Sequence, residues 1–172
     1  MPNSPNLDFS NPFTDDDIRA MCEALKNGLT PAEVSGIDRK QIEAIYSVAH
    51  SLYKTGKFKE AESAFKLLCF YDYYDSRFWM GLGAALQARE KYRLAADVYS
   101  VAALNEGLCD PTPFYFAGIC LLKDGDTQGA LGSWSCLQAL GQEGDSAHEA
   151  VKAKARKMIE LVEAQAKAKA SN

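Results

Sequence analysis

The sequence lacks the features that would place it at a membrane, outside the cell or on a nucleic acid. No apolar run in the 172-residue sequence approaches the length of ~18 residues that is needed to span a bilayer. The opening residues, MPNSPNLDFSNPF, have neither a positive start nor an apolar core, so we expect no secretory signal and a cytosolic protein. Acidic residues outnumber basic ones by 23 to 19, which disfavours direct nucleic-acid binding.

Signatures of catalysis are also missing. The sequence has no GxxxxGK[ST], GxGxxG or GxSxG motif for nucleotide binding or acyl transfer. Its two histidines, His50 and His148, have no Cys, Asp or Glu partner at zinc-ligand spacing. We therefore predict no metal site, no cofactor and no enzymatic activity.

Cysteines are few, odd in number and widely spaced. The five lie mostly within apolar helical patterns, and no CxxC pair occurs. We interpret them as buried free thiols. They are Cys22, Cys69, Cys109, Cys120 and Cys136.

What the sequence does contain is a pattern that recurs after 34 and then 35 residues. Each copy has a hinge residue, a small alanine and an aromatic residue at fixed spacing. The copies are Gly56, Ala61 and Phe65; Glu90, Ala95 and Tyr99; and Gly125, Ala130 and Trp134. Each copy predicts a pair of short helices joined at the hinge. The predicted fold class is all-α, with three tetratricopeptide-like hairpins in a short right-handed superhelix.

The repeats divide the chain into four parts. We predict a flexible tail at 1–13, an N-terminal helical arm at 14–37, three repeats within 38–144, and a C-terminal capping helix and tail at 145–172. The three repeats are 42–75, 76–110 and 111–144. The last helix should begin at Ser146 and cover the apolar face of the final hairpin, as the end of a stacked array requires.

Local signals fix where several helices begin and how closely they pack. Thr30 with Glu33, and Asp38 with Gln41, have the spacing of capping boxes. Glycine recurs at equivalent helical positions, Gly83 and Gly118, where the first repeat has Ala49. Because a helical glycine costs about 1 kcal/mol against alanine, its recurrence indicates close helix packing.

The first helix of the first repeat carries two apolar faces. One face is predicted to pack inside the hairpin; its residues are Ile42, Ile45, Val48, Ala49 and Leu52. The second face carries Tyr46, His50 and Tyr53. A helix with two such faces is covered on more than one side, so the second face needs another partner.

The repeats resemble the tetratricopeptide repeat, and two stretches resemble one family more closely. AIYSVAHSLYKTGKFKEAESAF and LLCFYDYYDSRFWMGLGAALQ are similar to the class II chaperones of bacterial type III secretion systems. The similarity extends over roughly residues 18 to 140. It implies a cytoplasmic bacterial chaperone that holds hydrophobic translocator proteins before export. It also implies a homodimer formed through Ile18, Met21 and Leu25, and, in some members, a transcription factor as a further partner.

In such repeats the first helix of each hairpin lines a concave groove. The resemblance implies that this groove binds an extended client segment with apolar residues and a proline. The side chains left over from hairpin packing are our candidates for this groove. They are Tyr46, His50, Tyr53, Phe58, Met80, Ala84, Gln87, Tyr115, Phe116 and Ile119. Small residues, Gly81, Ala84 and Ala88, are expected to leave room for the client backbone.

A different scaffold or regulatory protein built on the same repeats is the alternative. Such a protein would bind another peptide or a folded partner, including a transcription factor. Binders of a C-terminal carboxylate need Lys, Arg or Asn on the groove helices. The aromatic and apolar groove faces predicted here disfavour that mode.

Overall fold

The structure, a computed structural model, describes residues 15–142 and 144–170, and the predicted tail at 1–13 lies outside them. The described residues form α-helices and one short 3-10 helix. The helices are α1 (Asp15–Lys26), α2 (Pro31–Val34), α3 (Arg39–Lys54), α4 (Phe58–Tyr71), α5 (Ser76–Ala88), α6 (Tyr92–Asn105), α7 (Thr112–Lys123), α8 (Thr127–Cys136), the 3-10 helix η1 (Leu137–Ala139) and α9 (Ser146–Ala170). The predicted all-α fold is confirmed.

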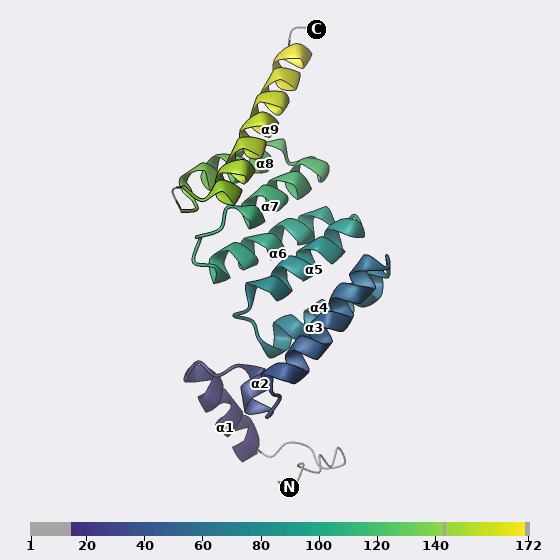
Figure 1. The fold of residues 1–172 in the computed structure, drawn as a ribbon, viewed down its shortest axis with the longest axis vertical. Helices are drawn as coiled ribbons and strands as arrows, with labels where there is room; N and C mark the ends of the chain where they lie inside the picture. Colours follow the sequence, from purple (N-terminus) through teal and green to yellow (C-terminus); the bar gives the residue numbers. More distant parts are fainter. Residues whose placement is uncertain (1–14, 143, 171–172) are drawn as a thin grey trace.

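Three helical hairpins stack in chain order along the long axis of the molecule (Figure 1). From α3 to α8, each helix packs against its neighbours in the sequence. The α9 helix packs on α8 and α7 and buries Ala155 and Val162, while α1 packs on α2 at the opposite end. Within the described ranges, no helix is both long and apolar enough to cross a membrane.

The two predicted capping boxes form at the starts of α2 and α3. Thr30 Oγ1 accepts a hydrogen bond from the Glu33 amide, and Glu33 Oε2 accepts one from the Thr30 amide at 2.7 Å. Asp38 and Gln41 make the same reciprocal pair, at 2.8 and 2.9 Å. These bonds satisfy amide groups that lack partners inside the helix.

Close approach between the helices of a hairpin explains the recurring glycines. A Cβ atom at Gly83 would lie 2.7 Å from Tyr99 Cε1, and one at Gly118 would lie 2.2 Å from Trp134 Nε1. Tyr99 and Trp134 are both buried. The prediction of close helix packing is therefore confirmed at both glycines.

One predicted core position is wrong. Ile42 and Ala49 are buried, and Ile45 and Leu52 pack partly against the core, but Val48 is 58% exposed. Tyr46 packs on the rings of Phe65 and Phe78. Val48 lies about 200° away around a helix of 3.6 residues per turn. The packing of Tyr46 therefore turns Val48 to the outside.

The prediction of buried thiols holds for only two cysteines. Cys69 and Cys120 are buried, and burial raises their pKa values to about 12 and about 11. The other three are exposed: Cys22, Cys109 and Cys136. Cys109 lies between α6 and α7 and Cys136 ends α8, where the apolar periodicity no longer reports which side is covered.

A buried carboxylate joins the first hairpin to the second. The Glu62 side chain is 5% exposed and accepts hydrogen bonds from Lys66 at 2.6 Å, from Lys91 at 3.2 Å and from Arg89. Burial pushes the pKa of Glu62 upward, but the three cationic donors outweigh it and lower the pKa to about 2. Because Arg89 and Lys91 lie at the hinge between α5 and α6, the carboxylate fixes that hinge against α4.

Glu90 occupies a backbone conformation that favours glycine. Its φ is 58°, while Gly56 and Gly125 hold the equivalent hinges with φ of 78° and 89°. An L-residue pays about 1–2 kcal/mol in this region. We expect Glu90→Gly to raise the free energy of unfolding by about 1 kcal/mol, measured by urea denaturation.

The reciprocal variant is the control. A Cβ atom added at Gly56 would meet open space, so Gly56→Glu introduces backbone strain without a clash and should lower the free energy of unfolding. A Glu90→Gly protein no more stable than the parent would show that φ at this hinge carries no cost.

Candidate peptide-binding groove

Two adjoining hollows lie along the helices that begin each hairpin. The hollow near α3, here called the α3 hollow, has a volume of about 390 Å³, and the one reaching α7, the α7 hollow, about 420 Å³. Tyr53, Met80 and Ala84 line both. The two hollows therefore adjoin along α3, α5 and α7, and together they are called the groove here.

Aromatic side chains form the floor of the α3 hollow. The Tyr46 ring lies 6.2 Å from the Phe65 ring in an edge-on arrangement, and stacks 6.1 Å from His50. Tyr46 also packs 5.6 Å from Phe78 of the next hairpin. These ring pairs hold Tyr46 in place and leave an apolar surface with polar edges.

The α7 hollow combines stacked rings with a buried hydroxyl. Tyr99 stacks on Phe116 with ring centres 5.5 Å apart, and its hydroxyl donates to Gln87 Oε1 at 3.0 Å. Burial raises the pKa of Tyr99, so this hydroxyl keeps its proton and stays a donor. At the edge, Lys123 Nζ lies 5.1 Å from the centre of the Tyr92 ring.

Most of the predicted groove residues line this groove. Those that do are Tyr46, His50, Tyr53, Met80, Ala84, Gln87 and Phe116. Phe58 instead packs beside Tyr53, with ring centres 5.5 Å apart. Tyr115 and Ile119 pack against the cluster around Trp134. Their roles in binding stay predictions.

Sequence reasoning missed part of the floor. The helical pattern places Phe65 in the packing of its own hairpin, but the ring also lines the α3 hollow. A Cβ atom at Gly81 would lie 2.2 Å from Phe65 Cε1, so the room expected at Gly81 is filled by that ring. The sequence signal for this contact was Gly81, a second helical glycine. It lies two residues before Gly83, the glycine that the repeat pattern explains.

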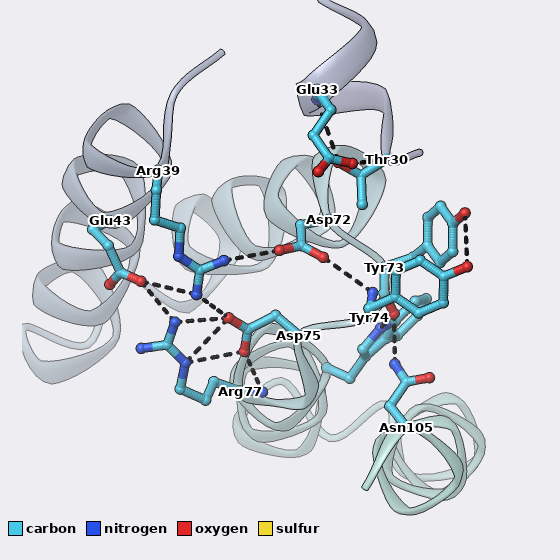
Figure 2. Close-up of polar contacts among 11 residues, drawn as sticks. Thr30, Glu33, Arg39, Glu43, Asp72, Tyr73, Tyr74, Asp75, Arg77 and Asn105 are labelled. Carbon is cyan, nitrogen blue, oxygen red and sulfur yellow. Dashed lines mark hydrogen bonds and ion pairs between the residues drawn. The ribbon is translucent and has the colours of Figure 1, made fainter. Parts of the chain in front are cut away.

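A network of charged side chains fixes α5 relative to α3 (Figure 2). Arg39 contacts Asp72 at 2.9 Å and Asp75 at 2.7 Å, and Arg77 contacts Asp75 and Glu43, each at 2.7 Å. The Asp75 side chain is only 11% exposed. Burial acts to raise the pKa of Asp75, but Arg77 and Arg39 outweigh it and lower the pKa.

Backbone contacts hold the same turn against the second hairpin. The Tyr73 carbonyl accepts hydrogen bonds from Trp79 Nε1 at 2.8 Å and from Asn105 Nδ2, as Figure 2 shows for Asn105. Asp75 also accepts from the Arg77 amide and so caps α5. The YDYYD segment is therefore the joint that sets one side of the groove.

Sequence comparisons agree with this architecture. The tetratricopeptide repeat family matches at residues 42–75 and 76–104. The chain is 40% identical over 107 residues to the low calcium response locus protein H of Yersinia pestis, covering 62% of this chain and 63% of that protein. The chain thus matches just under two thirds of that relative. It is 33% identical over 118 residues to the chaperone protein SicA of Salmonella typhimurium, covering 67% and 70%.

Solved structures of translocator chaperones also resemble this fold. The type III secretion translocator chaperone SycD of Yersinia enterocolitica superposes with a TM-score of 0.69 at 32% identity, over 77% of this chain and 97% of SycD. A second SycD structure is described as an alternative dimer. PcrH, in complex with the chaperone-binding region of PopD, superposes with a TM-score of 0.67 at 33% identity, over 76% and 96%.

Stacked hairpins that match the tetratricopeptide repeat at residues 42–75 and 76–104 define a tetratricopeptide-repeat protein. The relatives narrow this class further. With SicA and SycD matched over most of their lengths at more than 30% identity, the chain belongs to the type III secretion translocator chaperone family. The resemblance read from the sequence is confirmed.

The close contact between Gly81 and Phe65 predicts opposite effects for two alanine substitutions. Gly81→Ala should lower the free energy of unfolding by about 1–3 kcal/mol, because the new methyl group overlaps the Phe65 ring. Gly132 is also helical but has open space, so Gly132→Ala should raise it by about 0.5–1 kcal/mol. Urea denaturation measures both, and equal signs would contradict the contact.

Proposed function

We propose that this protein is a bacterial cytoplasmic chaperone that binds hydrophobic translocator proteins of a type III secretion system. It holds an extended segment of the client in the groove and keeps the client soluble until export. The observation that carries the proposal is the aromatic groove formed by two adjoining hollows along α3, α5 and α7 in a chain of this family. Such a role needs no catalytic group and no cofactor.

The groove chemistry suits an extended apolar segment. Tyr46, Tyr53 and Phe116 offer flat apolar surface, and a few buried anchors of this kind dominate the affinity of a peptide complex. The tyrosine hydroxyls and Gln87 add hydrogen-bonding groups for the client backbone. A client segment that contains proline is partly pre-ordered and loses less entropy when it docks.

Binding of the chaperone-binding region of PopD, labelled with a fluorophore, tests the groove. We expect the parent protein to bind this probe, and Tyr53→Ala to cost about 1–3 kcal/mol of binding free energy by fluorescence anisotropy. Tyr53 is the informative position because it lines both hollows. Ala84 also lines both hollows, so the larger side chain of Ala84→Arg should block the groove. This substitution adds atoms and removes none from the core.

Phe70→Ala is the matched control, because Phe70 is 62% exposed on α4 and lies outside the groove. It should bind the probe as the parent does. Coexpression with the hydrophobic translocators of the same secretion system adds a second readout, the amount of translocator kept soluble. A protein that neither binds the probe nor retains a translocator, or one that tolerates Ala84→Arg, would rule out the proposal.

We further propose that the protein forms a homodimer through α1. Leu25 lies half-buried on this helix, which packs mainly on the four-residue helix α2. The other two predicted contacts, Ile18 and Met21, are also residues of α1, but the structure does not describe their side chains. A dimer would cover an amphipathic helix that has little of its own chain to pack against.

Light scattering tests the dimer. We expect a mass of two protomers for the parent and of one protomer for Leu25→Glu, because a charge on the apolar face is costly to bury. Lys26→Glu alters the charge of the exposed neighbouring position and should leave the dimer intact. A parent that stays at one protomer across concentrations would exclude this assembly.

A further inference from the structure

One end of the groove carries two carboxylates. Glu106 directly follows α6 and Asp110 precedes α7, yet both line the α3 hollow beside Tyr46 and His50. The first turn of α5 completes this edge with Ser76 and Arg77. The aromatic floor of the α3 hollow thus ends in charged groups.

The single arginine at this edge is already neutralised. Arg77 contacts Asp75 and Glu43, each at 2.7 Å, and its guanidinium lies 5.1 Å from the centre of the Tyr46 ring. These partners hold the side chain against α3 and raise the pKa of Arg77, so it stays charged and bound to them. Its positive charge is therefore paired with the carboxylates of Asp75 and Glu43.

The two carboxylates have only neutral donors. Glu106 accepts a hydrogen bond from the Ser76 hydroxyl, and Asp110 accepts one from the Thr112 amide at 2.7 Å. His148 Nε2 lies 3.9 Å from Asp110, which is too far for a hydrogen bond but close enough for an ion pair when the imidazole is protonated. Among the residues that the structure describes, neither carboxylate forms an ion pair with a lysine or arginine. Within the described part of the chain, neither negative charge at this edge is therefore balanced by a lysine or arginine.

The opposite end of the groove is balanced. The α7 hollow is lined by one carboxylate, Glu90, and one ammonium group, Lys123. A client segment therefore meets an excess of negative charge at one end of the groove only. Charge complementarity of this kind sets orientation and partner choice more than total affinity.

We propose that the α3 hollow recognises a lysine or arginine side chain of the client, next to an apolar anchor, through Glu106 and Asp110. The inference rests on the function proposed above and adds to it a determinant of client choice and direction. The alkyl part of a basic side chain can lie on the Tyr46 and His50 rings while its charge reaches the two carboxylates. Glu106 and Asp110 are then the specificity-determining residues of this end.

A charge scan of the PopD probe tests the inference. Each position outside its apolar anchors is changed in turn to lysine, glutamine and glutamate, and the affinity of each peptide is measured by anisotropy. We expect at least one position where lysine binds about 3- to 10-fold more tightly than glutamine, and glutamate more weakly than glutamine. Raising the salt concentration should shrink this preference.

Paired variants locate the preference. The double variant Glu106→Gln, Asp110→Asn keeps the shape of both side chains and their hydrogen bonds, and it should abolish the preference for lysine. Glu160→Gln with Glu163→Gln removes the same number of charges from exposed positions on α9, outside the groove, and should retain it.

The possible outcomes separate this inference from the proposed function. Binding of the probe with no position that prefers lysine, or a preference that survives the Glu106 and Asp110 changes, overturns the charge recognition and leaves the groove function standing. No binding by any peptide of the scan overturns both. Loss of the preference in the α9 control would show a net-charge effect and also overturn the inference.

Discussion

The close contact between a small residue on the first helix of a hairpin and an aromatic ring on the second is the constraint on which this structure depends. Gly83 lies against the Tyr99 ring and Gly118 against the Trp134 ring. A Cβ atom at either glycine would overlap the facing ring. Because the helices touch there, their separation and rotation are set. Their outer faces then take fixed directions, and the hairpins can stack with one side left open as a groove.

The first hairpin shows how this constraint also builds the binding surface. Its equivalent small residue is Ala49, and the Phe65 ring reaches across to fill the space above Gly81 of the second hairpin. Phe65 thereby becomes floor for the α3 hollow as well as core. The ion pairs of Asp75 with Arg39 and Arg77 hold the joint in the same register. Packing and client binding consequently share residues, so groove variants need controls that report stability.

Sequence reasoning reached much of the fold and a good part of the groove. Hinge residues, capping boxes and the period of the aromatics predicted the hairpins, because each signal acts within a few residues of its own position. Tyr46, Tyr53 and Met80 were predicted for the groove from their place on the first helices and do line it. Val48 was misplaced, because periodicity alone does not reveal which of two apolar faces a neighbouring helix will take.

The sequence by itself determined that the chain forms three helical hairpins, where each one turns, and which family it belongs to. These properties depend on local backbone preferences and on the spacing of residues along single helices. Only the tertiary structure decided that Phe65 lies over Gly81, and that Glu106 and Asp110 line the same hollow as Tyr46, some sixty residues earlier in the chain. The reason is physical: stacking brings together residues from separate hairpins, and the angle of that stacking is fixed by contacts between side chains distant in sequence.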